Sequence, residues 1–268
     1  MIPAHIKSII LDMDGVLWKA DTPIGDLPAI FNRIERRGLK VAFATNNGTR
    51  TPEQYVERLA GFGVPVEKQQ ILTSALAAAE LLARRFSHLP SGEALGVKVF
   101  AIGGAGVMTA LREKGFELLS VEDAEKAQAV VMGIDPQINF DKMREATLLV
   151  QRGMPFYATN PDKTFPTPRG EIPGAGAWIA VVVTATGIQP IYAGKPAPYL
   201  LELARERMGT LKEETLVVGD RLETDIAGGQ AAGCLCALVM SGVSTRAQAE
   251  SWRPKVDVIA EDLATMVG

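Results

Sequence analysis

Short apolar runs alternate with longer segments of helical periodicity along nearly the whole chain. The first run is Ser8 to Leu11, and the second, Lys40 to Ala44, follows an amphipathic segment that begins near Leu27 and stops at Gly38. Further runs of this kind lie at residues 98–102, 129–132, 155–158, 191–193, 215–218, 235–239 and 256–259. Such alternation predicts an α/β fold with a mainly parallel sheet.

The expected helices have recognisable boundaries. Thr51-Pro52 begins one of them, because threonine suits the N-cap and proline the first helical position. Further helical segments lie at residues 75–86, 141–152 and 176–186, and another follows Gly103-Gly104-Ala105-Gly106 and ends at Lys114. Residues 73–187 repeat the strand–helix pattern as a unit of their own, and alternation resumes at residue 191.

Polar residues directly follow several of the apolar runs. They form four groups: Asp12 with Asp14, Thr45 with Asn46, Lys195, and Asp220 with Asp225. Each group taken singly is typical of a solvated turn or a helix cap. In open α/β sheets, however, ligands bind at the carboxyl ends of the strands. We therefore expect the four groups to meet at one edge of a sheet.

Carboxylates gathered at one edge would repel one another and raise one another's pKa unless a cation lies among them. Oxygen ligands without histidine or cysteine favour Mg²⁺, which often works beside a phosphate. A lysine and a hydroxyl–amide pair at the same edge would suit the remaining phosphate oxygens. The pattern thus indicates a magnesium and phosphate site.

Composition narrows the chemistry further. The 268 residues are 47% hydrophobic and 22% charged, with a net charge of −3, which gives no electrostatic footprint for nucleic acid or an anionic membrane surface. Two histidines and two cysteines are too few for a familiar zinc site, and neither histidine neighbours a serine or cysteine nucleophile. Chemistry based on carboxylates remains.

The hydropathy, the N-terminal pattern and the cysteines indicate the cellular compartment. The most apolar window, residues 175–185, is shorter than the ~18 residues that suggest a membrane span, and the N-terminus lacks the pattern of a signal peptide. Cys234 and Cys236 are interpreted as reduced, buried thiols. A soluble cytoplasmic protein without membrane association is expected.

Four motifs together resemble those of haloacid dehalogenase superfamily phosphatases. In chain order they are Asp12-x-Asp14-Gly15-Val16, Thr45-Asn46, Lys195-Pro196 and Gly219-Asp220-x-x-x-x-Asp225. The insertion, with Ala158-Thr159-Asn160-Pro161-Asp162 and Pro173-Gly174-Ala175-Gly176-Ala177, is similar to the cap of the NagD-like, or p-nitrophenyl phosphatase, subfamily. The resemblance implies a Rossmann-like, doubly wound core of residues 1–72 and 188–268, and an inserted α/β cap of residues 73–187.

The resemblance also implies roles for individual residues. Asp12 would be the nucleophile that forms an aspartyl-phosphate, and Asp14 the general acid and base. The Mg²⁺ ligands would come from Asp12, the Asp14 carbonyl and Asp220, with Asp225 either a further ligand or an orienting group outside the ligand shell. The residues that would bind the phosphoryl group are Thr45, Asn46, Lys195 and Thr224. Asp14 favours ester hydrolysis, since related ion-pump ATPases and dehalogenases lack this second aspartate.

The loop of residues 162–169 would select the substrate by the same resemblance. Phe165 could stack on a ring, and Lys163 or Arg169 could meet an anionic group; the alternative is an exposed loop with solvated charges. The expected partner is a small phosphate ester of the p-nitrophenyl, nucleotide monophosphate, phosphoglycolate, sugar or pyridoxal phosphate type, and no nucleic acid polymer. A homodimer through the cap stands only as an analogy.

Two other functions remain open at this point. The chain could be a phosphotransferase or phosphomutase that passes the phosphoryl group to an acceptor, or a non-catalytic protein that binds phosphorylated metabolites. The intact pair Asp12 and Asp14 argues against the non-catalytic alternative. The sequence leaves the physiological ester undetermined.

Overall fold

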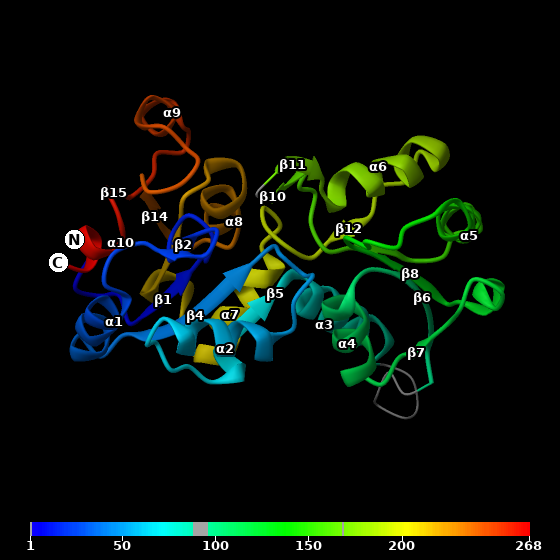
Figure 1. The fold of residues 1–268 in the computed structure, drawn as a ribbon, viewed down its shortest axis with the longest axis horizontal. Coiled ribbons are helices and arrows are strands. Elements are labelled where there is room, and N and C mark those ends of the chain that lie inside the picture. Colours follow the sequence, from blue (N-terminus) through cyan, green and yellow to red (C-terminus); the bar gives the residue numbers. More distant parts are fainter. Residues whose placement is uncertain (1, 88–95, 168) are drawn as a thin grey trace. The chain divides into compact units, whose positions relative to one another are not determined.

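The computed structural model describes residues 2–87, 96–167 and 169–268 and forms two compact units (Figure 1). The first unit comprises Met1–Thr45, Pro52–Leu72 and Lys195–Gly268. The second comprises Asn46–Thr51 and Thr73–Gly194. The sequence pattern predicts an insertion of residues 73–187; the second unit begins at the same residue, extends to Gly194 and also takes in residues 46–51.

The first unit is built on a six-stranded sheet with the strand order β15-β14-β13-β1-β4-β5. Its strands are β1 (Ser8–Leu11), β4 (Lys40–Thr45), β5 (Ile71–Thr73), β13 (Thr215–Gly219), β14 (Leu235–Val239) and β15 (Val258–Ala260). The central strand β1 pairs in parallel with both β13 and β4. The predicted α/β class is therefore confirmed.

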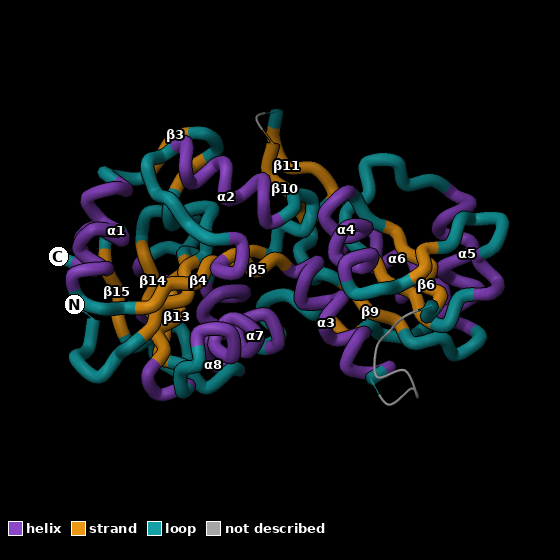
Figure 2. The backbone as a smooth tube through the Cα atoms, turned by 90° about the horizontal axis from the view of Figure 1, so that it is seen from below, coloured by secondary structure: helices purple, strands orange, loops and turns teal. Residues whose placement is uncertain are grey.

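Helices cover both faces of this sheet. They are α1 (Leu27–Arg36), α2 (Pro52–Gly61), α7 (Tyr199–Met208), α8 (Ala227–Ala231), α9 (Arg246–Ser251) and α10 (Leu263–Val267). In Figure 2, α1 and α2 lie on one side of the sheet, and α7 and α8 on the other. Because both faces are covered, consecutive residues of β1 are all buried, which explains its continuous apolar run.

Local sequence signals set the ends of α1. The Asp26 side chain accepts a hydrogen bond from the Ala29 backbone N–H (3.1 Å), and Gly38 adopts a left-handed φ of 66° just beyond the last turn. The expected stop at Gly38 is confirmed. The hairpin formed by β2 (Trp18–Lys19) and β3 (Thr22–Pro23), which directly follows the turn after β1, is not predicted by the pattern.

The second unit has a five-stranded sheet with the order β12-β9-β8-β6-β7. Its strands are β6 (Lys98–Ile102), β7 (Glu117–Leu118), β8 (Ala129–Met132), β9 (Phe156–Ala158) and β12 (Ile191–Tyr192), and its helices are α3 (Ser74–Phe86), α4 (Ala105–Glu113), α5 (Phe140–Gln151) and α6 (Ala175–Thr186). All the pairs in this sheet are parallel. α3 packs against α4, and α5 against α6.

Single helical turns complete the two units. They are the 3-10 turns η1 (Lys68–Gln70), η2 (Ala124–Lys126) and η3 (Lys212–Glu214), and the π-helical turn η4 (Leu222–Ile226). The expected substrate loop, residues 162–169, contains β10 (Thr164–Thr167), which pairs antiparallel with β11 (Gly170–Pro173).

One sequence-based expectation is wrong. The sequence pattern predicts that the run at residues 191–193 resumes the alternation of the core, but β12 pairs with β9 in the second sheet. The hydrogen bonding between these two segments continues past β12. The backbone N–H groups of Ala193 and Gly194 donate to the carbonyls of Ala158 and Thr159 (2.9 and 2.7 Å). Lys195 consequently does not follow a strand of the first sheet.

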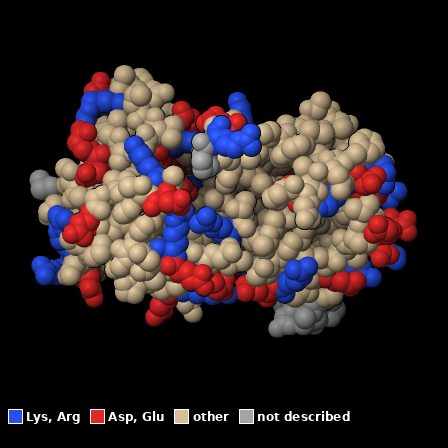
Figure 3. All heavy atoms as spheres, viewed as in Figure 1, with Lys and Arg blue, Asp and Glu red and all other residues tan. Residues whose placement is uncertain are grey.

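The surface carries both signs of charge. Figure 3 shows Lys and Arg side chains interspersed with Asp and Glu over the face in view, as the small net charge leads one to expect. Among the described residues, no helix has the length and apolar character needed to cross a membrane.

Candidate active site

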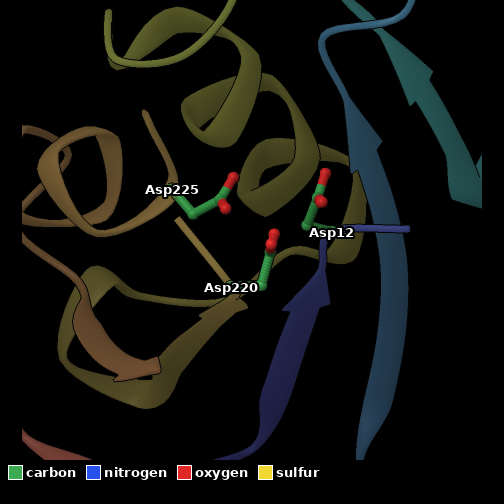
Figure 4. A group of neighbouring side chains, drawn as sticks. All are labelled: Asp12, Asp220 and Asp225. Atoms are coloured by element: carbon green, nitrogen blue, oxygen red, sulfur yellow. The ribbon is translucent and has the colours of Figure 1, made fainter. Parts of the chain in front are cut away.

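Three aspartates meet at the carboxyl ends of two neighbouring strands of the first unit. Asp12 directly follows β1, and its backbone N–H donates to the carbonyl of Val218 in β13 (2.9 Å). Asp220 directly follows β13, and Asp225 lies in η4. Figure 4 shows the three side chains together beyond the ends of β1 and β13. In the part of the chain that the structure describes, they form a group in which one carboxylate oxygen from each residue lies within 4.8 Å of the other two.

Lys195 joins two of these aspartates. Its Nζ donates to Asp12 Oδ1 (2.6 Å) and to the backbone carbonyl of Ala44 (2.9 Å), and it lies 2.6 Å from Asp225 Oδ1. The Lys195 side chain is only 3% exposed, so these ion pairs are shielded from water. The lysine therefore neutralises part of the negative charge of the group.

Backbone N–H groups fix the other two carboxylates. The N–H of Val243 donates to Asp220 Oδ2 (2.7 Å), and the N–H of Arg221 donates to Asp225 Oδ2 (3.0 Å). Asp225 is thus held on one oxygen by the main chain and on the other by Lys195. Hydrogen bonds from fixed backbone donors orient both side chains.

Glycines make room for these carboxylates. A Cβ atom at Gly15, whose φ is +86°, would lie 2.5 Å from Asp220 Oδ2, and one at Gly242 would overlap the same carboxyl group. A Cβ at Gly219 would overlap the Asp225 side chain. The Ser241 hydroxyl donates to the Gly15 carbonyl (2.7 Å) and so fastens this turn.

The electrostatics of the group are dominated by burial. Burial raises the pKa of the Asp12 carboxyl well above its usual value, and the charges of Asp225 and Asp220 raise it further, against the opposing effect of Lys195. Burial and the neighbouring Asp225 raise the pKa of Asp220 to about 6. Burial would lower the pKa of Lys195, but Asp12 and Asp225 outweigh it and raise that pKa. The lysine is therefore charged at neutral pH.

The donor set fits a hard divalent cation. All the metal-donor atoms of the group are oxygens, three carboxyl groups gather beside one lysine, and burial, together with repulsion between the carboxylates, raises the pKa of both Asp12 and Asp220. Mg²⁺ prefers such oxygen ligands, and a bound cation would remove the electrostatic penalty on the ionised carboxylates.

Asp14 lies outside the group of three carboxyl groups, in the turn after β1. Its side chain is exposed, and Oδ1 accepts a hydrogen bond from the indole N–H of Trp18 (2.8 Å). Thr224 lies within η4 between Asp220 and Asp225 in sequence and is half-buried.

The predicted pair Thr45 and Asn46 lies where the two units divide. Thr45 is buried at the end of β4 in the first unit, whereas Asn46 belongs to the second unit. There the Asn46 amide donates to both carboxylate oxygens of Asp162 (3.1 and 3.3 Å). Its carbonyl accepts hydrogen bonds from the Asn160 amide (2.8 Å) and the Ser74 hydroxyl (2.5 Å).

The predicted specificity residues lie on the β10–β11 hairpin of the second unit. Lys163 and Arg169 are exposed, and Phe165 in β10 is half-buried. Pro168, which the expected loop also contains, lies outside the described residues. Contact of this hairpin with a substrate stays a prediction.

Several residues that touch the site were missed from the sequence. Ser241, Gly242 and Val243 follow β14, so their position after an apolar run is a signal that the sequence contains. Trp18 gave no such signal, because it ends the apolar run Val16-Leu17-Trp18 and resembles an ordinary core residue.

Comparisons with known proteins agree with this geometry. A family model of haloacid dehalogenase-like hydrolases matches residues 9–117, and a second HAD-hydrolase-like model matches residues 192–266. An acid sugar phosphatase of Staphylococcus aureus (strain USA300) is 36% identical over 239 residues, which cover 89% of this chain and 88% of the relative.

Solved structures give the same relationship. NagD from Escherichia coli K-12 superposes with a TM-score of 0.86 at 32% identity, covering 97% of both chains. A glycerol phosphate phosphatase from Mycobacterium tuberculosis, solved in complex with magnesium, superposes with a TM-score of 0.88 at 31% identity, covering 99% of this chain and 78% of that one. With these similarities along nearly its whole length, the chain belongs to the haloacid dehalogenase-like hydrolases, in the NagD-like subfamily.

Proposed function

We propose that this chain is a Mg²⁺-dependent phosphatase that hydrolyses small phosphate monoesters through an aspartyl-phosphate on Asp12. The observation that supports this function best is the buried group of Asp12, Asp220 and Asp225 around Lys195, at the carboxyl ends of β1 and β13. Similarity to an acid sugar phosphatase and to a glycerol phosphate phosphatase supports the same reaction class.

The proposed reaction has two steps. A carboxylate oxygen of Asp12 attacks phosphorus, and the bond from phosphorus to the leaving oxygen breaks while Asp14 gives that oxygen a proton. Asp14 then takes a proton from water, whose oxygen attacks the aspartyl-phosphate and releases phosphate. Lys195 offsets the charge of Asp12 and of the phosphoryl oxygens, while Thr45 and Asn46 hydrogen-bond to the phosphoryl group.

Mg²⁺ would be held by the carboxylates of Asp12 and Asp220 and by the Asp14 carbonyl, where it supplies charge neutralisation for the transferring phosphoryl group. Asp225 acts from outside this ligand shell, since Lys195 and the Arg221 N–H already engage its two oxygens. Thr224, on the same π-helical turn as Asp225, completes the phosphate-binding set.

The substrate class we propose is a sugar or polyol phosphate, by similarity to the relatives named above. Lys163, Phe165 and Arg169 select among these esters: the two cations meet anionic groups, and the aromatic ring packs against the carbon skeleton. A panel of sugar, polyol and nucleotide phosphates ranked by kcat/KM tests this assignment. A clear preference for nucleotides would contradict it.

Hydrolysis of p-nitrophenyl phosphate tests the reaction itself. Activity should require Mg²⁺, disappear with a chelator, and fall by at least about 10³-fold in Asp12→Asn, which lacks the nucleophilic carboxylate. Asp123→Asn is the matched control, because Asp123 is an exposed carboxylate paired with Lys126 in the second unit. Undiminished turnover in Asp12→Asn would overturn the proposed function.

Product analysis separates hydrolysis from phosphoryl transfer. With glycerol present, a phosphatase releases one inorganic phosphate for each p-nitrophenol. A phosphotransferase would instead yield glycerol phosphate and correspondingly less inorganic phosphate. A protein that binds phosphate esters without turning them over would release neither product.

A further inference from the structure

The turn after β1 folds back on itself and places Trp18 against Asp14. The Leu17 backbone N–H donates to the Met13 carbonyl (2.8 Å), and the Gly15 N–H donates to the Trp18 carbonyl (2.8 Å). An isolated β-bridge joins Asp14 and Trp18. The indole N–H consequently donates to Asp14 Oδ1 at 2.8 Å.

The indole ring is held far more firmly than the carboxylate it contacts. Trp18 is completely buried, the Arg58 guanidinium carbon lies 4.3 Å from the indole ring centroid, and the Phe62 ring centroid lies at 5.8 Å. Arg58 is itself anchored by the Ala20 carbonyl. A cation over the face of an indole and aromatic packing beside it both stabilise the ring. The direction of the N–H is thereby fixed.

Asp14 has no comparable packing, because its side chain is exposed. An exposed aspartate samples several rotamers, and a catalytic group that is misplaced by an ångström can lose much of its effect. The hydrogen bond from the buried indole restricts this freedom from one side. It leaves Oδ2 as the carboxyl oxygen that can exchange a proton.

We propose that Trp18 is a positioning residue that holds the Asp14 carboxyl group, through Oδ1, in the orientation for proton transfer at Oδ2. This inference rests on the proposed function, in which Asp14 protonates the leaving oxygen. The O–H bond at Oδ2 breaks as the leaving alkoxide gains its proton. The same oxygen regains a proton from the attacking water, so Asp14 ends each turnover unchanged.

The test compares two leaving groups. p-Nitrophenolate leaves readily without a proton, whereas an alkoxide such as glycerol from glycerol phosphate requires one. In Trp18→Phe, which keeps a buried ring and removes the N–H donor, the single-turnover rate of ester cleavage, which precedes the water step that both esters share, should fall by about 10- to 100-fold for glycerol phosphate. The single-turnover rate of ester cleavage for p-nitrophenyl phosphate should fall by no more than about threefold, and KM for both esters should stay nearly constant.

The chain offers a matched control for this variant. Trp252 also donates its indole N–H to a side chain of the first unit, Gln230 Oε1 (3.1 Å). Trp252→Phe therefore makes the same substitution and removes the same kind of bond away from Asp14. It should lower both rates equally or not at all. The retained p-nitrophenyl phosphatase activity of Trp18→Phe shows that this variant folds.

A double-mutant cycle with Asp14→Asn gives an independent readout. If Trp18 acts through Asp14, then Trp18→Phe should change the single-turnover rate for glycerol phosphate by less than about twofold once Asp14 is already asparagine. Equal loss on both esters in Trp18→Phe, or full additivity in the cycle, would overturn the positioning role. Either result would leave the proposed function standing so long as Asp12→Asn is inactive and Mg²⁺ is required.

Discussion

Similar residues follow the strands of the two sheets, but the aspartates at those strand ends differ in how far their charge is balanced. In the first unit, β4 ends at Thr45, which Asn46 follows, and Lys195 pairs with Asp12 at the end of β1. In the second unit, Thr159-Asn160 follows β9. There Lys142 pairs with Asp135, three residues after β8, at 2.7 Å.

The difference lies in what surrounds each ion pair. Asp135 has one lysine to itself and also accepts a hydrogen bond from the Gln137 backbone N–H (2.8 Å), so its charge is balanced. Lys195 instead faces Asp12 and Asp225, with Asp220 beside them. In the second unit, Gly106 in the first turn of α4 allows close approach of the backbone of Gly48 and Arg50, whereas in the first unit Gly15 and Gly242 make room for a carboxylate. Parallel strands thus bring polar residues together at one edge of a sheet. An excess of buried negative charge at that edge is what favours the binding of a cation.

Replacing Lys195 or Lys142 by methionine should give the largest difference between the two units. Lys195→Met leaves buried carboxylates without their counter-ion, so we expect a loss of ~3–5 kcal/mol in the free energy of unfolding and about 10³-fold in kcat. The stability loss should be greater at pH 8 than at pH 5, where the raised pKa of Asp12 allows protonation.

Lys142→Met is the matched variant in the second unit. Its partner keeps the backbone hydrogen bond and the Lys142 side chain is 24% exposed, so the expected cost is roughly 1 kcal/mol with little change in kcat. Urea unfolding and p-nitrophenyl phosphate turnover measure both quantities. Equal effects of the two substitutions would show that the excess charge of the first site has no consequence.

Adding one methyl group at a closely packed glycine of each unit should give a smaller and qualitatively different contrast. In Gly242→Ala the new Cβ overlaps the Asp220 carboxyl group, so kcat should fall by about 10²-fold as that group is displaced. In Gly106→Ala the Cβ instead meets the backbone carbonyls of Gly48 and Arg50, so stability should fall by about 1–3 kcal/mol. Turnover per folded molecule and urea midpoints distinguish the two outcomes, and a Gly242→Ala enzyme with normal turnover would contradict the assigned role of Asp220.

The smallest expected effect concerns pH. The pKa of Asp220 is about 6 in the folded protein and ordinarily near 4 in an unfolded chain. Between these values the folded state binds a proton that the unfolded state has lost, so the free energy of unfolding of the metal-free protein should fall by about 2 kcal/mol as pH rises from about 4 to about 6.

Mg²⁺ should stabilise the protein more at pH 8 than at pH 5, because it binds the ionised carboxylates. The measurement is urea unfolding across this range with Mg²⁺ or a chelator, for wild type and Asp220→Asn. The difference between wild type and variant in the slope of the free energy of unfolding against pH gives the contribution of the Asp220 carboxyl group. Identical slopes would contradict the pKa assignment.

Much of the core site could be predicted because it depends on strand ends. Asp12 and Asp220 directly follow apolar runs, and adjacent parallel strands bring such residues together whatever the intervening sequence. The sequence predicts Lys195 as a site residue because it follows an apolar run, but that run belongs to the second sheet. Its Nζ nonetheless donates to Asp12 Oδ1 (2.6 Å) and to the Ala44 carbonyl (2.9 Å), and the first unit resumes at this residue.

Other features depend on contacts that no local pattern contains. The hairpins β2–β3 and β10–β11 have strands of two to four residues, too short for a clear alternation. Asn46, for example, donates hydrogen bonds to Asp162, which lies 116 residues away in the sequence. The support for Asp220 from Val243 is likewise a matter of tertiary packing.

The inclusion of residues 46–51 in the second unit has a consequence for recombining members of this family. A chimera that exchanges only residues 73–194 would separate Gly106 from Gly48, whose carbonyl it packs against, and Asn160 from the Asn46 carbonyl to which it donates. The six-residue segment would then come from one parent and its packing partners from the other. A transplantable module therefore consists of two pieces of chain, and crossover points placed at residues 46 and 51 as well as 73 and 194 preserve its native contacts.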